Sequence, residues 1–186
     1  MYNHNANQPG PPFDARAVAN FLLDLASADQ IPITQLQLYK IVYFCHGWYL
    51  AEHNRPLVWN IFEVWKHGPV IKVLRDNFEK FGSDPISVKA TEFDYEKGQY
   101  FVSEASFSKE IVNHITAIYR IYAHISGLQL SLMTHEAGGA WDRIWNSRVP
   151  SGRFAMRIRE HEILEDFIKL RAETKFDNLG AKLIRR

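Results

Sequence analysis

The segment from Thr34 to Glu52 constrains the fold more than any other part of this 186-residue chain. Its apolar side chains fall on every side of a helix instead of along one stripe: Leu36, Leu38, Ile41, Val42, Phe44, Cys45, Trp48 and Tyr49. A helix that is apolar all round is usually buried all round. We therefore expect a central helix, capped by Thr34, that the other elements surround.

Five other helices are predicted around it from caps and one-face apolar spacing. Residues 14–28 form one, capped by Asp14, and residues 108–126 form another, capped by Ser108, which stops at Gly127. Pro69 is expected to open a helix that reaches Gly82, because the first helical position needs no N–H. The remaining two helices are expected over residues 128–137 and 160–172.

A β-hairpin is predicted between the helix that Pro69 opens and the helix over residues 108–126. Apolar residues alternate from Ile86 to Tyr95, and Tyr100 and Val102 alternate again after the turn Glu96-Lys97-Gly98. Residues 57–66 mix strand and helix signals and stay unassigned. The predicted fold class is mainly α, in an α+β arrangement, with about six helices around the buried central helix and one hairpin.

Length and composition favour one globular domain. Residues 1–13, rich in Asn, Gly and Pro, are expected to be a mobile extension, residues 14–173 a single domain, and residues 174–186 a loose basic tail. The net charge of +1 exerts no overall pull on nucleic acid or on an anionic membrane. A single cysteine, Cys45, without a recognisable signal peptide or membrane-spanning segment, favours the cytoplasm.

No catalytic or metal site can be assembled from the residue spacing. Cys45 and His46 are neighbours, so on a helix they point about 100° apart, and a thiol among aromatic residues stays protonated. The eight histidines lack the close spacings of zinc sites. Gly68-Pro69 is too short for a phosphate-binding loop. We therefore predict no enzyme, no metal and no cofactor.

An ordered set of short motifs accompanies the central helix. Leu38-Tyr39-Lys40-Ile41 lies within it, a corner from Trp65 to Val70 follows, and LSLMTH (residues 130–135) precedes Trp141. In this order and spacing the chain resembles the Panacea antitoxin domain family over residues 14–167. That family includes SocA-like antitoxins and the phage-associated protein GepA. The resemblance implies a protein that binds and restrains a toxic partner, with no chemistry of its own.

The resemblance also singles out individual residues. The family pattern places a lysine where Lys40 stands and includes the motif residues Gly68, Pro69, Val70, Thr134, His135 and Trp141. A lysine on so apolar a helix must reach water, pair with a carboxylate or contact a ligand, so a structural ion pair and an exposed contact both stay open. Trp65 either fills the core or anchors a partner. His135 is expected to bond backbone groups that a short helix leaves unpaired.

One basic concentration follows Trp141 and is interleaved with Trp145 and Phe154: Arg143, Arg148, Arg153, Arg157 and Arg159. Arginine with aromatic residues is typical of protein interfaces, and it can also hold RNA by stacking and phosphate contact. Because the net charge is near zero, we favour a protein partner, or simply solvated arginines, over nucleic acid. The predicted partner-contact residues are Lys40, Trp65, Arg143, Arg148, Arg153 and Arg157.

Together with the resemblance, these features predict the antitoxin of a toxin–antitoxin pair, which neutralises a cognate protein toxin by direct complex formation. The resemblance also implies adaptors that deliver the toxin to a AAA+ protease, and both modes stay open, as does a homo-oligomer. The alternative is a phage-associated or prophage regulator that binds nucleic acid through the arginine cluster. A hydrolase is the weakest interpretation, because no nucleophile–base–orienter set can be assembled.

Overall fold

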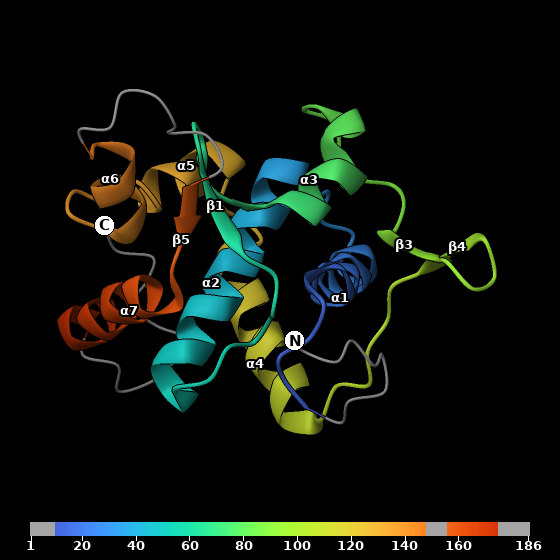
Figure 1. Ribbon diagram of the computed structural model, residues 1–186, viewed down its shortest axis with the longest axis horizontal. Helices are drawn as coiled ribbons and strands as arrows, with labels where there is room; N and C mark the ends of the chain where they lie inside the picture. Colours follow the sequence, from blue (N-terminus) through green and yellow to red (C-terminus); the bar gives the residue numbers. More distant parts are fainter. Residues whose placement is uncertain (1–9, 148–155, 175–186) are drawn as a thin grey trace.

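The computed structural model describes residues 10–147 and 156–174, which form a mainly helical α+β fold (Figure 1). The helices of these residues are α1 (Ala15–Ala28), α2 (Gln35–His53), α3 (Lys72–Phe78), the short 3-10 helix η1 (Glu79–Phe81), α4 (Lys109–Tyr122), α5 (Gly127–Met133), α6 (Ala140–Trp145) and α7 (Glu160–Thr174). The strands are β1 (Phe62–Trp65), β2 (Gly68–Ile71), β3 (Thr91–Asp94), β4 (Gln99–Val102) and β5 (Met156–Ile158).

Helix α2 is the central element, as predicted. Thr34 caps it in a reciprocal arrangement with Gln37, and Asn54 ends it in the left-handed conformation. Every residue from Leu38 to Leu50 is buried. The helix packs against α1, α3, α4, α5, α7 and β2, which explains why its apolar residues are not confined to one face.

Aromatic side chains fill the space between α2, α4 and α7. The ring of Phe44 stacks on Tyr122 with centroids 4.2 Å apart, and the indole N–H of Trp48 donates to the Tyr122 hydroxyl at 3.2 Å. The ring of Phe167 from α7 lies where a side chain at Gly47 would begin. A glycine in the middle of α2 therefore lets α7 approach closely.

A small antiparallel sheet replaces the helix predicted to begin at Pro69. Its strand order is β2-β1-β5, and the β1–β2 register pairs Trp65 with Gly68 and Val64 with Pro69. Pro69 thus lies in an edge strand, where its missing N–H costs no sheet hydrogen bond. The helix, α3, begins only at Lys72. The unassigned residues 57–66 contain β1.

The predicted hairpin is present as β3 and β4, with Phe93 opposite Tyr100. Its strands are shorter than the alternation indicated, because Ile86 instead donates its N–H to the Ile33 carbonyl, at 2.8 Å. The predicted stop at Gly127 is wrong. Helix α4 ends at Tyr122, and Gly127 begins α5 under a capping box from Ser126.

Two further differences concern the end of the chain. Residues 140–145, which no predicted helix includes, form α6, and residues 156–158, also outside the predicted elements, form β5 beside β1. No helix within the described residues is both long and apolar enough to cross a membrane.

Phe44 provides the test of this core, together with its buried neighbours Ile41 and Trp48. We expect Phe44→Ala to lower the free energy of unfolding by about 3–5 kcal/mol, since it removes a ring stacked in a packed interior. Urea unfolding measures the change. Leu132→Ala is the control, because Leu132 is exposed and its loss should cost no more than about 0.5 kcal/mol. An unchanged midpoint for Phe44→Ala would contradict the central position of α2.

Candidate functional site

Side chains from three helices hold the turn between β1 and β2, and we call this set the turn clamp. Each of them donates a hydrogen bond to a different backbone carbonyl of the turn or of the strand residues beside it. The bonds are Lys40 Nζ (α2) to Pro69 O at 2.9 Å, Ser131 Oγ (α5) to His67 O at 2.8 Å, and Trp141 Nε1 (α6) to Trp65 O at 2.8 Å. The motifs that are dispersed in the sequence therefore meet at one place.

Gly68 is the point of closest approach in the turn clamp. Its φ is +99°, in the region that favours glycine. A Cβ there would lie 2.6 Å from Lys40 Nζ and would collide with Thr134 Oγ1. Any side chain at Gly68 would thus push the lysine off the Pro69 carbonyl. The residues at the tip of the turn, Lys66 and His67, remain exposed.

Lys40 makes neither the structural ion pair nor the exposed contact that the sequence left open. Its side chain is 0% exposed, and it makes no ion pair with the described residues. Burial lowers the pKa of its ammonium group from the ordinary 10.5 to about 7. A buried lysine that binds a carbonyl joins α2 to β2, and in this conformation it cannot touch a partner on the surface.

Thr134 and His135 follow α5 and pack beside the clamp. The Thr134 hydroxyl donates to the Ser131 carbonyl at 2.8 Å. The His135 ring stacks on Trp141 with centroids 3.7 Å apart, and its Nε2 has no hydrogen-bond partner among the described residues. Burial first, and then the charges of Lys40 and His67, lower the pKa of His135. The prediction that His135 bonds backbone groups is wrong, because its ring supports Trp141 instead.

Trp65 does not fill the core. Phe62 and Val64 take the buried positions of β1, and Trp65 lies half-buried on the opposite face of the strand. Its indole N–H donates to Glu63 Oε2 at 3.0 Å, and the Arg75 guanidinium lies 4.8 Å from its ring centroid. Part of the indole is accessible to solvent on this face, and the rest packs against the core.

The arginine cluster is only partly described. Arg148 and Arg153 lie outside the described residues. The side chain of Arg143 is fixed by contacts within the protein. It donates to Gly138 O at 2.6 Å and pairs with Asp166 at 3.2 Å. Burial raises the pKa of Asp166, which also accepts the Ala140 N–H. Arg157 is exposed on β5, opposite Glu63 of β1.

Cys45 and His46, the two neighbours that could suggest catalysis, are both buried. Cys45 is buried and its thiol pKa is raised by burial, so the thiolate is disfavoured. Burial lowers the pKa of His46 to about 3, and its Nδ1 accepts the Val58 N–H at 3.4 Å. The described residues contain no group of three or more His, Cys, Asp or Glu side chains able to hold a metal.

A cleft of about 300 Å³ lies between the α5–α6 loop and α7. Its lining includes Thr134, Arg143, Asp166 and Phe167, and neither Cys45 nor any histidine borders it. The Cys45–His46 pair therefore does not border this cleft.

Ser131 is the clamp residue that sequence reasoning missed. It stands inside the LSLMTH motif, three positions before Thr134, and its side chain is buried in a short helix. A buried serine must find a hydrogen-bond acceptor. The position of Ser131 within the motif was visible in the sequence. Its acceptor, the His67 carbonyl, depends on the β1–β2 turn, which was not predicted.

Comparison with known proteins places these motifs in one family. A family model described as "Antitoxin SocA-like, Panacea domain" matches residues 38–142. Antitoxin SocA of Caulobacter vibrioides (strain NA1000 / CB15N) is 37% identical over 154 residues, which are 83% of this chain and 82% of that protein. No solved structure matches the chain.

The buried state of Lys40 predicts how stability depends on pH. Above pH 7 the folded chain releases the Lys40 proton, whereas the unfolded chain keeps it up to its ordinary pKa of 10.5. The free energy of unfolding should therefore rise with pH across this window, relative to Lys40→Met, by up to about 1.4 kcal/mol per pH unit. Urea unfolding of both proteins across the window measures it. Lys109→Met, which removes an exposed lysine, controls for general charge effects. A difference independent of pH would show that Lys40 is not buried as described.

The pairing of Arg143 predicts weak binding to nucleic acid. Because Asp166 already neutralises this guanidinium, Arg143 has little charge to offer a phosphate. Gel-shift titrations with generic RNA and DNA at physiological salt should show only weak binding, unaltered by Arg143→Gln. Submicromolar affinity for either polymer would instead favour the nucleic-acid regulator.

Proposed function

The chain belongs to the Panacea-domain family of SocA-like antitoxins, and on this premise we propose that it neutralises a cognate protein toxin by forming an inactive complex with it. The observation that carries the proposal is the family match over residues 38–142, which contains the turn clamp from Lys40 to Trp141.

The geometry supports a binding function. Three helices converge on one turn and fix it, which suits a surface that must keep its shape for a partner. Cys45 and His46, the one pair that suggested a nucleophile and base, are buried in α2 with the thiol and the imidazole both held neutral. Neutralisation is therefore proposed to be stoichiometric and without catalysis.

We propose contact roles for the half-buried Trp65 and the exposed Arg157. Trp65 and Arg157 lie on neighbouring strands, β1 and β5, and Arg148 and Arg153 stay predictions outside the described residues. Lys40 and the motif residues act through the fold instead, because they fix the turn that follows Trp65.

Two fates of the bound toxin follow from the same complex. In sequestration the toxin survives in inactive form, and in adaptor function a AAA+ protease degrades it. We place the complex in the cytoplasm. Measuring the toxin's half-life after translation is stopped, with and without the antitoxin, separates these fates.

Stoichiometric neutralisation makes a prediction for variants. Cys45→Ser, His46→Gln and His135→Gln proteins that still fold should still rescue cells that express the toxin, because none of these side chains performs chemistry. Catalytic residues lose orders of magnitude in rate when removed, whereas binding contacts lose affinity one interaction at a time. The measurement is co-expression with the protein encoded by the adjacent gene, followed by size-exclusion chromatography of the purified pair.

The control is a variant that does not fold, identified by its thermal melt, which should fail to rescue. Rescue by trace amounts of the chain without any complex, abolished by one folded His or Cys variant, would mean that the antitoxin is an enzyme.

A further inference from the structure

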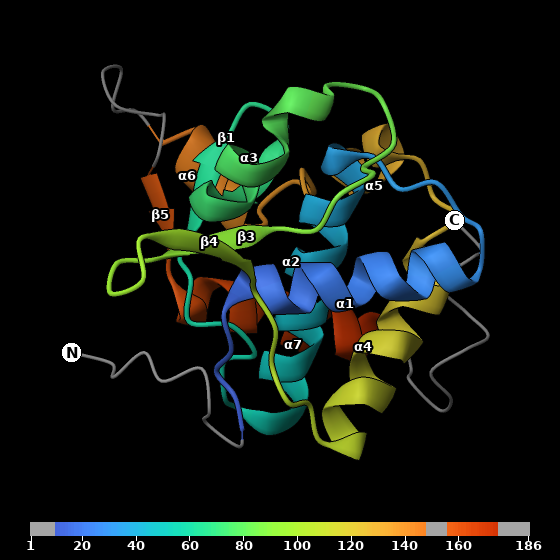
Figure 2. The same cartoon turned by 90° about the vertical axis from the view of Figure 1, so that its right-hand side faces the viewer.

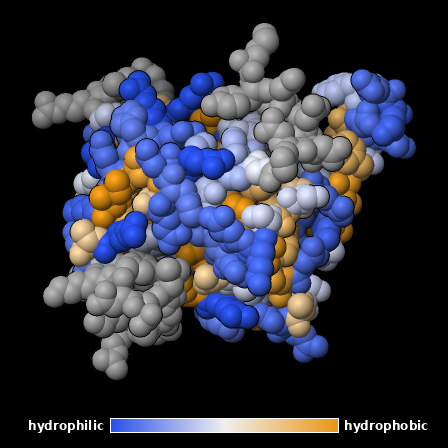
Figure 3. Space-filling view, turned by 90° about the horizontal axis from the view of Figure 1, so that it is seen from below, coloured by the Kyte–Doolittle hydropathy of each residue, from blue (hydrophilic) through white to orange (hydrophobic). Residues whose placement is uncertain are grey.

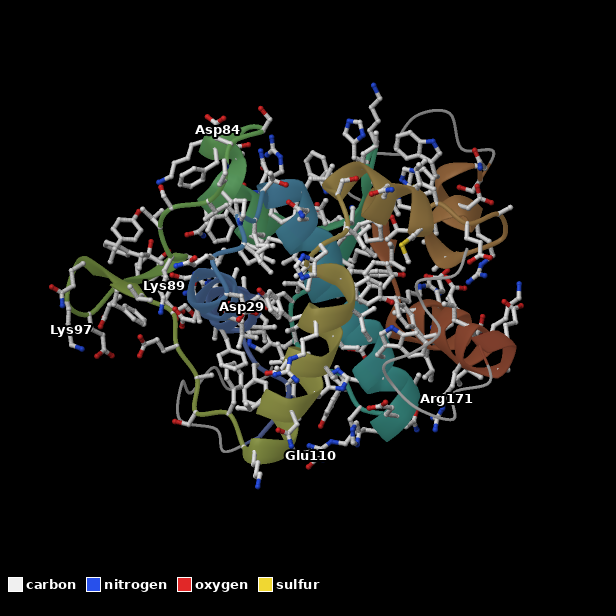
Figure 4. All side chains as sticks on the ribbon, turned by 180° about the vertical axis from the view of Figure 1, so that it is seen from behind. Asp29, Asp84, Lys89, Lys97, Glu110 and Arg171 are labelled. Atoms are coloured by element: carbon white, nitrogen blue, oxygen red, sulfur yellow. The ribbon has the colours of Figure 1, made fainter. Side chains whose placement is uncertain are left out.

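The β3–β4 hairpin projects from the helical body beyond α1 (Figures 1 and 2). Arg16 of α1 contacts β3, where it pairs with Glu92 at 2.9 Å and donates to the Thr91 carbonyl at 3.4 Å. All four residues of β4 are exposed. Lys97, at the tip, lies far from the body when the molecule is seen from behind (Figure 4). A lone two-stranded hairpin is only marginally stable in water, so an exposed one needs another source of stability.

Buried polar side chains anchor the base of this hairpin. Asn20 of α1 accepts the Ala90 N–H at 2.7 Å and donates to the carbonyls of Ala90 and Ser103 at 2.9 and 2.8 Å. One step along β3, the N–H of Thr91 donates to Asn77 at 2.9 Å. The hairpin is therefore fixed at its base, and only its stem extends into solvent.

These anchors also reveal which edge of the hairpin is open. The backbone N–H of Thr91 points away from β4, toward Asn77, so Thr91 and Val102 form a non-hydrogen-bonded pair. Because antiparallel ladders alternate, the N–H and C=O groups of Tyr100 and Val102 point outward from β4. No described residue pairs with this edge.

The open edge of β4, a strand of four residues, lacks two of the usual protections against strand pairing, proline and charge. Natural edge strands are blunted by proline, charged residues, bulges or covering elements. The sequence of β4 is Gln99 to Val102, Q-Y-F-V, which contains neither proline nor charge. An edge of this kind is suited to accept another strand.

One face of the hairpin is aromatic. Phe93 packs edge-on against Tyr95 and Tyr100, with centroids 5.0 Å apart in both pairs. Val102 shares this face, since it lies two residues from Tyr100. Tyr95 and Tyr100 are 89% and 72% exposed. The hairpin arm at the right of Figure 3 shows hydrophobic residues beneath a hydrophilic tip. An incoming strand would thus find an apolar surface for its alternate side chains.

Acidic residues flank the edge at both ends. Glu96 lies in the turn before β4 and Glu104 follows it, and both are exposed without an ion pair to a described residue. The one lysine of the turn, Lys97, is paired with Asp94 at 3.2 Å. Two antiparallel copies of β4 would bring Glu96 of each near Glu104 of the other, which is unfavourable. A second copy of this chain is therefore the wrong occupant, and a strand with basic ends is the right one.

We propose that the toxin docks on this edge by adding an extended strand to β4, with apolar residues facing Tyr100 and Val102 and basic residues near Glu96 and Glu104. This inference rests on the proposed function, and it names the surface and the kind of toxin segment that the antitoxin recognises.

Hydrogen exchange on the complex with the protein encoded by the adjacent gene tests the edge directly. The outward amides of Tyr100 and Val102 should exchange at least about tenfold more slowly in the complex than in the free chain, because the added strand would bind them. The amide of Thr91, already bonded to Asn77, should change little. Unchanged exchange at Tyr100 and Val102 in a stable complex would overturn the inference and leave the proposed function standing.

Proline substitution isolates the backbone contribution. Val102→Pro removes an outward N–H without removing a hydrogen bond between β3 and β4, and should weaken the complex by about tenfold or more. Val102→Thr keeps that N–H and the branched shape, so it should bind much more tightly than the proline variant. Equal affinities for both variants and the wild type would count against strand addition.

Charge reversal tests the flanks. Glu96→Lys with Glu104→Lys should weaken the complex, and added salt should weaken the wild-type complex, because the attraction is electrostatic. Asp84→Lys with Glu173→Lys, two exposed acids elsewhere, is the matched control.

Three other outcomes would contradict the inference. If Arg157→Glu abolished the complex while the hairpin variants did not, docking would lie on the β1–β5 side. If the free chain dimerised and Val102→Pro made it monomeric, the occupant would be a second copy. If the wild type formed no complex at all, the proposed function itself would fall.

Discussion

Helix α2 must be covered on all sides, and this requirement organises the whole molecule. Leu38 to Leu50 have no solvent-facing side, so helices before and after α2 in the chain and one strand of the small sheet have to pack around it. Gly47 lets α7 lie against the helix, and the stacked pair Phe44–Tyr122 joins it to α4. The burial of Lys40 follows from the same constraint, because a lysine in the second turn of a helix covered on all sides has no path to water. Its ammonium group is satisfied by the Pro69 carbonyl, which places β2 against α2.

The turn clamp is thus a consequence of core packing, and it links the core to the surface. Lys40 reaches the turn from inside, and Ser131 and Trp141 reach it from α5 and α6. Gly68 is required because its backbone lies against Lys40 Nζ and Thr134 Oγ1. The motifs that mark the antitoxin family therefore maintain the shape of the domain. We propose that recognition of a particular toxin uses surfaces outside these motifs, among them the β3–β4 hairpin.

The sequence correctly predicted the features that depend on residues close together in the chain, namely helix caps and the burial of α2. Asp14, Thr34 and Ser108 each cap the helix that was assigned to them, and the all-round apolar pattern of α2 gave its central place. Pro69 was misassigned because the first turn of a helix and an edge strand make the same demand, a residue that donates no hydrogen bond. Only the pairing of β1 with β2, a tertiary event, distinguishes the two. The partners of Lys40 and His135 were missed for the same reason, since the Pro69 carbonyl and the Trp141 ring come from elements distant in the sequence.

The central claim is that the chain restrains its toxin by binding it, molecule for molecule. Titration of the purified toxin's activity with the purified chain tests this most directly, with the protein encoded by the adjacent gene as the toxin. Binding predicts that activity falls in proportion to the chain added, reaches its minimum at a fixed molar ratio, and does not change further with time. Complete loss of activity at a small fraction of that ratio, progressing with time of incubation, would contradict it, because only a catalyst acts repeatedly.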